Sequence, residues 1–553
     1  MAKQEKQKKA RIFHYNIPVE TAWLILIFLL AFFLRATSHG IMFPYSSGDE
    51  AGFFMAAFDF LKAFEPVSLG NSISHLFGLF AFAWGYPTIL LIAANAAVFG
   101  ILGLQISEFV LGLPFILLGS LGCILFFLIA KRMFGANAGL VAALFAAMLP
   151  INIYLSTWGG ANQIVANFFF LLTIYLFFEF FSSNFKKFSK LAFISLGIYL
   201  CSETQFWGIL PLLFLISFFH SEKQNTASRV WRSLKAFFRK ELLLTFLIML
   251  PLFAVQAYFV LNPATHEPTE GFLGHILTKK IATGNYLPVT LDLAFKDAGF
   301  ILSIIFLAGF FWLLRTVKKE KNSRFLFAWF IIQFLPWAFL VGPKQTDTKI
   351  YFMQFFSALI LMASAAAGDF AKAAYSRFRL KFGFLLLAFA LLQFFLVWQP
   401  MEQAGKNEIY LGNEYINTGV KTAGYFFREN IDENKAIFTD FEPNVARYYF
   451  GRDVFAIFDP QEKNIWEYFD SIKNKADYIA IQEASREKGE KSLAGEFYRI
   501  AEISFEGKKI MFIYSREKQG IVEMRTEEFD AIFDKKYGNL KSLYFEKNWE
   551  ENH

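Results

Sequence analysis

Residues 126–157, FFLIAKRMFGANAGLVAALFAAMLPINIYLST, hold the end of one apolar run, a short turn with Lys131 and Arg132, and a second apolar run. The two runs extend over residues 106–130 and 138–155. A helix needs about 20 apolar residues to cross roughly 30 Å of hydrocarbon. This stretch therefore predicts two neighbouring membrane spans joined by a short basic loop.

The same pattern continues along the chain, which has 553 residues, is 55% hydrophobic and contains 74 Phe. We predict a polytopic α-helical membrane protein with about eleven spans. Residues 191–220 could form one long helix or two short ones, and residues 51–64 and 86–101 favour amphipathic or re-entrant helices in the first loop. The predicted spans are 19–36, 106–130, 138–155, 163–182, 191–203, 206–220, 241–261, 298–314, 325–342, 351–367 and 381–398.

The basic residues predict the orientation of these spans. With a cytoplasmic N-terminus, 25 Lys and Arg of the first 399 residues fall in inner segments and seven in outer ones. Positive charge is concentrated in cytoplasmic loops. We therefore expect a multi-pass plasma membrane protein with residues 400–553 outside the cell. The net charge of +7 combines +14 in the membrane half with −7 in residues 400–553, so nucleic acid is not an expected partner.

Residues 400–516 read as a soluble extracytoplasmic α/β domain. Short β-rich runs, KAIFTD, DVFAIF, DYIAIQ and KKIMFIYS, alternate with helical patterns. Four strands with intervening helices predict a compact domain of two or three layers. We divide the chain into a membrane domain, 1–399, whose first outer loop is 37–105, this outer domain, and a charged C-terminal tail, 517–553.

Polar side chains collect at the predicted outer face of the membrane. Ionisable groups at membrane depth are costly and usually functional, so their convergence suggests a shared site. Each also has a structural interpretation: Asp49 and Glu50 could cap the following helix, Glu203 could close a helix end, and Lys349 could be an interfacial anchor. The candidates from the outer segments are Asp49, Glu50, Asn162, Glu203, His266 and Lys349.

The candidate residues favour chemistry on a substrate that the membrane delivers. The chain lacks the nucleotide-binding, zinc-protease and serine-hydrolase motifs. A sugar linked to a lipid phosphate needs only one general base, because the phosphate leaves without protonation. A Lys beside the phosphate would stabilise the departing charge. His266 and His275 lack metal-ligand spacing, so no cofactor is assigned and a divalent cation is unsupported.

Several segments, in order, resemble one family of membrane enzymes. They are SSGDEAGFFMAAFDFLKA, WGYPTILLIAANAAVFG, FFLIAKRMFGANAGLVAALFAAMLPINIYLST and TDTKIYFMQFFSAL. The chain resembles the GT-C superfamily, and within it the dolichyl-phosphate-mannose protein mannosyltransferase-like group, glycosyltransferase family 39, which includes lipid A aminoarabinose transferases. The resemblance implies an inverting membrane glycosyltransferase that uses a polyprenyl-phosphate-linked sugar.

The resemblance also implies roles for individual residues. Asp49 matches the family's catalytic acid and would be the general base, and Glu50 matches the neighbouring supporting acid. Lys349 and Tyr351 fall where family members contact the lipid phosphate. We add Glu203, Asn162 and His266 as candidate substrate-binding residues. The expected partners are the polyprenyl-phosphate sugar, membrane lipids and a lipid, protein or glycan acceptor.

Two other functions are compatible with parts of the sequence. An oligosaccharyltransferase would usually carry a Trp-Trp-Asp type motif in its outer domain, where this chain has only Trp466 and Trp549 apart from each other. A transporter would show paired broken helices in matching halves, and no halves match. A membrane transporter, or an envelope-assembly binding protein with a non-catalytic outer domain, is the alternative to the transferase.

Overall fold

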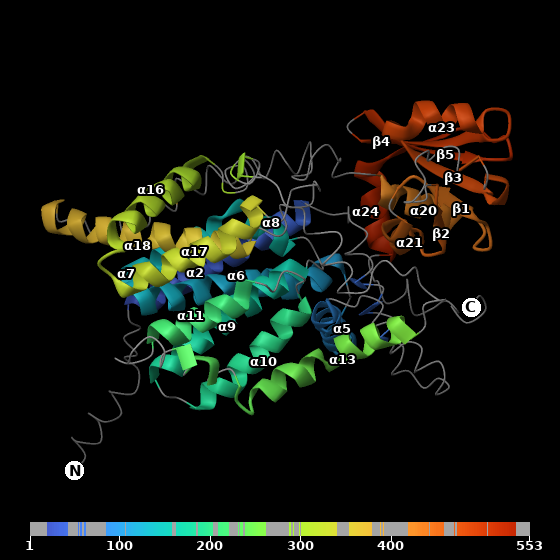
Figure 1. Cartoon of the computed structure of the whole chain (residues 1–553). Coiled ribbons are helices and arrows are strands. Elements are labelled where there is room, and N and C mark those ends of the chain that lie inside the picture. The colour runs from blue at the N-terminus through green and yellow to red at the C-terminus, as the bar shows by residue number, and fades with distance from the viewer. Residues whose placement is uncertain are drawn as a thin grey trace, which may run out of the picture.

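The computed structural model describes most of the membrane helices and most of the outer domain (Figure 1). The statements below concern the described residues only. The described residues are 19–41, 85–104, 107–157, 162–183, 186–202, 208–220, 238–261, 300–339, 353–378, 419–441, 443–457, 473–505 and 507–537. Isolated positions within 53–61, 230–235, 287–298, 388–391 and 469–470 are described as well.

The membrane half is a bundle of helices. Each predicted span that the structure describes corresponds to a helix, with the break at Leu149–Pro150 dividing 138–155 into two, and 191–220 forms two helices. Span 381–398 lies almost entirely outside the described residues. The helices are α2 (Val19–Ile41), α5 (Tyr86–Ile101), α6 (Glu108–Phe134), α7 (Ala136–Met148), α8 (Pro150–Thr157), α9 (Asn162–Ser183), α10 (Lys186–Ser202), α11 (Ile209–His220), α13 (Leu242–Leu261), α16 (Phe300–Thr316), α17 (Lys321–Phe339) and α18 (Met353–Phe378).

Four of these helices are long and apolar enough to cross a membrane, with the relevant stretches Val19–Thr37, Phe109–Phe134, Asn162–Phe181 and Gln354–Ala371. Six shorter apolar helices of 10–17 residues accompany them. Large apolar side chains such as Leu26, Leu247 and Phe311 are about half exposed on the outside of the bundle. Such an apolar exterior fits hydrocarbon rather than water.

The ends of α6, α7 and α8 follow from local chemistry. The Ser107 hydroxyl accepts a hydrogen bond from the Val110 amide at the start of α6. Pro150 has no amide hydrogen and suits the first position of α8. The break leaves the last carbonyls of α7 without helical partners, and the buried Arg35 guanidinium donates to the carbonyls of Ala146 and Ala147.

Ion pairs define one end of the bundle, which we call the basic end. Lys131 at the end of α6 pairs with Glu20 at the start of α2. Arg132 pairs with Glu179 near the end of α9 at 3.7 Å. Asn322, at the start of α17, donates to the Met133 carbonyl at 2.6 Å. The start of α9 and the end of α17 therefore lie at the opposite end, which we call the outer end. The start of α18 lies there too, because Gly368 in the second half of α18 packs against Ala138, close to the basic end.

A six-stranded sheet organises the C-terminal domain. Its strand order is β2-β1-β3-β5-β4-β6, with β2, β1 and β3 parallel to one another, β5 antiparallel to both β3 and β4, and β6 parallel to β4. The four strands expected from sequence are β1, β2, β3 and β5, and the sheet has β4 and β6 in addition. The strands are β1 (Ile437–Thr439), β2 (Val454–Ala456), β3 (Tyr478–Gln482), β4 (Tyr498–Phe505), β5 (Lys508–Ser515) and β6 (Val522–Arg525).

Helices cover both faces of the sheet, so the domain has three layers (Figure 1). On one face lie α20 (Val420–Asn430), α21 (Pro443–Phe450) and α24 (Thr526–Tyr537), and on the other α23 (Arg486–Leu493). Lys421 of α20 pairs with Asp534 of α24 at 2.9 Å, and the Thr422 hydroxyl donates to Asp530 at 2.8 Å. The sheet and its helices thus continue past residue 516, where the sequence analysis places the end of the domain.

The outer domain meets the bundle at the outer end (Figure 1). Phe54, from the first loop, lies with its ring 6.4 Å from that of Tyr448 in α21. Both side chains are fully buried. The segment that follows Asp49 and Glu50 in the sequence is therefore packed directly against the outer domain.

Candidate functional site

The predicted site residues come from segments far apart in the sequence. Of these residues the structure describes only Asn162, at the start of α9. The others lie outside the described residues: Asp49, Glu50, Glu203, His266, Lys349 and Tyr351. The described positions next to several of them show how the structure arranges the chain there.

Asn162 is buried and holds the end of α10. Its Nδ2 atom donates to the Ser202 carbonyl at 3.2 Å, and its side chain is 3% exposed. Ser202 is the last residue of α10 and directly precedes Glu203. The amide hydrogen therefore satisfies one of the free carbonyls at a helix C-terminus. Asn162 has a positioning contact here, which fixes the point where the chain enters the segment 203–207.

Gly85 connects the start of α5 to α10 and to the first loop. Its amide donates to the Cys201 carbonyl at 2.8 Å, and its φ of +96° lies in the region that favours glycine. A Cβ built on Gly85 would lie 2.9 Å from Cε1 of Phe53 and 4.0 Å from Cβ of Asn162. Phe53 is 1% exposed and follows Asp49 by four residues in the sequence. Gly85 therefore lets the first loop pack tightly between α5 and α9.

Neighbouring contacts fix the same junction. The Tyr86 hydroxyl donates to the Ile248 carbonyl in α13. Phe53 and Phe54, consecutive residues, contact different bodies: Phe53 lies against Gly85 in the bundle and Phe54 against Tyr448 in the outer domain. These two contacts hold Phe53 against the bundle and Phe54 against the outer domain. The sequence analysis missed Gly85, and the Gly-Tyr-Pro order at the start of α5 is the signal that could have found it.

Arg35 is a fully buried cation near the outer end of α2. Its Nε donates to the Ser156 hydroxyl at 3.1 Å, and its other bonds go to the carbonyls of Ala31, Ala146 and Ala147. Among the described residues it forms no ion pair. Gly119 of α6 leaves room for it, because a Cβ there would lie 2.9 Å from the Arg35 Nε. Arg35 thus ties α2, α7 and α8 together.

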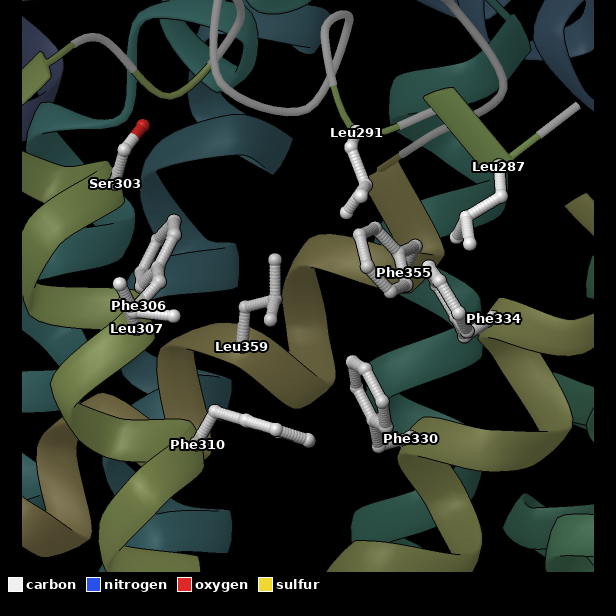
Figure 2. Close-up of a pocket in the computed structure, with 10 residues that line it drawn as sticks. All are labelled: Leu287, Leu291, Ser303, Phe306, Leu307, Phe310, Phe330, Phe334, Phe355 and Leu359. Atoms are coloured by element: carbon white, nitrogen blue, oxygen red, sulfur yellow. The ribbon is translucent and has the colours of Figure 1, made fainter. Parts of the chain in front are cut away.

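An apolar pocket of about 250 Å³ opens between α16, α17 and α18 (Figure 2). Helices α16 and α18 touch closely at Gly309, where a Cβ would lie 2.6 Å from the Ala363 amide nitrogen, and the pocket lies on the outer side of this contact. Among the described residues of its lining, Ser303 has the one polar side chain. The other lining residues are Leu287, Leu291, Phe306, Leu307, Phe310, Phe330, Phe334, Phe355 and Leu359.

The pocket is apolar and lies toward the end of the bundle where α18 begins. Phe355 and Leu359 lie in the first turns of α18, which begins two residues after Tyr351. Within the residues that the structure describes, no three His, Cys, Asp or Glu side chains group together as a metal site would require.

Comparisons with known proteins identify relatives of this fold. The family model described as dolichyl-phosphate-mannose-protein mannosyltransferase matches residues 87–259. No curated protein matches the chain by sequence.

Two solved structures are similar over most of the chain. ArnT from Cupriavidus metallidurans, bound to undecaprenyl phosphate, is 13% identical with a TM-score of 0.59, covering 90% of this chain and 99% of its own. The oligosaccharyltransferase AglB from Archaeoglobus fulgidus, in complex with an inhibitory peptide and a dolichol-phosphate, is 14% identical with a TM-score of 0.54, covering 85% of this chain and 70% of its own. The chain therefore shares the fold of these two solved structures, and its residues 87–259 match the mannosyltransferase family model.

Proposed function

We propose that this protein transfers a sugar from a polyprenyl-phosphate-linked donor to an acceptor at the outer face of the membrane. The apolar pocket between α16, α17 and α18 carries the proposal, because it suits the hydrocarbon chain of such a donor. Two structural relatives were solved with undecaprenyl phosphate and dolichol-phosphate, which supports the same donor class here.

The proposed reaction is a single displacement with inversion at the sugar. Asp49 removes the proton from the acceptor nucleophile, whose heteroatom forms a bond to the anomeric carbon. The bond between that carbon and the phosphate oxygen breaks, and the electron pair leaves with the polyprenyl phosphate. Lys349 and Tyr351 bind the phosphate and stabilise its added charge, while Glu50 supports Asp49. Glu203, Asn162 and His266 are proposed to contact substrate.

The packing around the first loop supports a role for Asp49. An acid that acts as a general base must stay within about 3 Å of the proton that it removes. The contacts of Phe53 with Gly85 and of Phe54 with Tyr448 hold the following segment from two sides. A segment that served only to connect two helices would not need contacts with both the bundle and the outer domain.

The lipid pocket is tested with two variants on one helix. Leu307 lines the pocket and is 48% exposed, whereas Ile304, 52% exposed on the same helix, does not line it. We expect Leu307→Trp to fill the pocket and weaken binding of undecaprenyl phosphate about tenfold or more. Ile304→Trp, which adds the same ring toward lipid, is expected to bind as the wild type does. The measurement is a titration of each purified protein in detergent.

Equal affinities of the two variants would show that the donor chain does not use this pocket. Lys349→Ala provides a second measurement on the same lipid, since loss of the cation should weaken binding of the phosphate. Mass spectrometry of the cell envelope with and without the protein would then name the sugar and the acceptor. Wild-type protein that binds undecaprenyl phosphate but transfers none of its sugar derivatives would favour the alternative, a transporter or an envelope-assembly binding protein.

A further inference from the structure

Three buried amide side chains in the bundle have an atom without a hydrogen-bond partner among the described residues, Asn152 in α8 and two others that lie on helices packed against α11. The two others are Gln333 of α17, which is 1% exposed and leaves its Nε2 donor free, and Asn167 of α9, which is 4% exposed and leaves its Oδ1 acceptor free. Buried polar atoms almost always have partners. A free donor and a free acceptor therefore need an explanation, most of all inside a membrane.

The two amides lie at the same level of the bundle. Helices α9 and α17 run antiparallel, because Phe178 packs on Phe325 with ring centres 5.3 Å apart and Phe170 packs on Trp329 at 6.0 Å. Asn167 comes three residues before Phe170, and Gln333 comes four residues after Trp329. One helical turn is 3.6 residues, so both amides lie about one turn closer to the outer end than the Phe170–Trp329 contact.

The start of α11 completes this group. A Cβ on Gly208 would lie 2.6 Å from the Gln333 Nε2, so only glycine leaves room for the amide there. Helix α11 packs against both α9 and α17. Gly208 is the first described residue after the segment 203–207, whose other end is held by the bond between Asn162 and Ser202. The start of α11 thus lies against the unused donor of Gln333.

Gln333 also borders the lipid pocket. Phe330 and Phe334, which line the pocket, are the residues at three positions before and one position after it on the same helix. Successive helix residues are rotated by about 100°, so the amide points about 60–100° around the helix from the two rings. A donor with its chain in the pocket could therefore place its head group on the Gln333 side of α17.

We propose that Gln333 and Asn167 bind the glycosyl group of the lipid-linked donor through its hydroxyl groups. A hydroxyl both accepts and donates, so one sugar can satisfy the Nε2 donor and the Oδ1 acceptor together. A binding site built this way discriminates strongly against a ligand without the hydroxyls, because the buried amides then stay unpaired. This inference rests on the proposed function, and it assigns the head group to the side of α17 that carries Gln333.

The test compares two kinds of lipid in each variant. Purified protein in detergent is titrated with undecaprenyl phosphate and with its mannose, glucose and galactose derivatives. We expect the wild type to bind at least one sugar derivative about tenfold more tightly than the sugar-free lipid. Gln333→Leu and Asn167→Leu should each reduce that preference by about fivefold or more and leave the affinity for undecaprenyl phosphate within about twofold. Leu removes the hydrogen bonds at similar volume.

Thr173→Val is the matched control, because Thr173 is a buried polar residue of α9 whose hydroxyl is paired with that of Ser195 at 2.8 Å. It should keep the wild-type preference for sugar. A wild type that binds all four lipids equally, or Leu variants that keep its preference, would overturn the assignment while leaving the lipid pocket intact. A wild type that binds none of the four lipids would instead contradict the proposed function and this inference with it.

Discussion

Gly85 gives the sharpest mutational test of the junction at the outer end. Alanine at a left-handed position costs about 1–2 kcal/mol through backbone strain alone. At Gly85 the new Cβ would also lie 2.9 Å from the Phe53 ring, about 0.5 Å inside ordinary contact. Phe53 is 1% exposed, so its ring is enclosed by protein rather than by solvent. Overpacking of this kind adds about 1–3 kcal/mol.

Gly103 provides the matched control, since it has a φ of +67° and no atom within 4 Å of its ideal Cβ. Gly103→Ala introduces the same kind of backbone strain but brings the new Cβ close to no other atom. Misplacing a reacting group by 1 Å can lower the rate about a hundredfold, so a shift of half an ångström is expected to lower it about tenfold. We therefore expect Gly85→Ala to lower the rate of sugar transfer about tenfold or more, and Gly103→Ala to change it by less than about threefold.

The assay measures transfer of a labelled sugar from its polyprenyl-phosphate donor in proteoliposomes. Folding is followed in parallel with a thiol-reactive dye, because Cys123 and Cys201 are buried in the folded protein and become reactive when it unfolds. The comparison uses only protein that remains folded at the assay temperature. Equal transfer by the two alanine variants would refute the idea that Gly85 positions the first loop through Phe53.

Two further predictions concern the outer domain. Phe54→Ala and Tyr448→Ala should each lower the kcat/KM of transfer, and the double variant should be little worse than either single one, because both substitutions remove the same contact. Additive losses would contradict this coupling. Tyr448→Phe, which keeps the ring, should transfer sugar at the wild-type rate. Burial raises the pKa of Asp440 to about 6, although the Gln482 amide and the Ser485 side chain donate to it. Between about pH 4 and 6, Asp440 is therefore protonated in the folded state and ionised in the unfolded state. The free energy of unfolding falls as the pH rises through this range, by about 3 kcal/mol at most for a difference of two pKa units. Asp440→Asn should flatten the dependence of the midpoint of thermal unfolding on pH, whereas Glu523→Gln, at an exposed position, should keep it; an unchanged slope in Asp440→Asn would contradict the assignment.

The helices of the bundle follow closely from hydropathy, because each described span is a continuous apolar run. The break between α7 and α8 follows from Pro150 together with Arg35, and the role of Arg35 depends on carbonyls more than a hundred residues away in the sequence. Strand β4 was not predicted from the sequence, because Arg499 and Glu502 interrupt its apolar pattern. In the structure Glu502 pairs with Arg499 and Lys509, which allows a charged side chain to be 5% exposed within the sheet.

The candidate site shows the same difference between local and distant information. Adjacent acids such as Asp49 and Glu50 are conspicuous in a sequence this apolar. Gly85 and Gln333 are not conspicuous, because a single glycine or glutamine in an apolar run can have a purely structural role. Their significance depends on Phe53 and Gly208, which the fold brings to them from other helices.

The measurement that tests the central claim most directly is sugar transfer by Asp49→Asn. The variant is reconstituted in proteoliposomes with the polyprenyl-phosphate sugar that the wild type uses, and binding of the same donor is titrated in parallel. With Asp49 as general base, transfer falls by about 10²- to 10⁴-fold while the affinity for the donor stays within about threefold. Transfer at the wild-type rate by a folded Asp49→Asn protein would contradict the account.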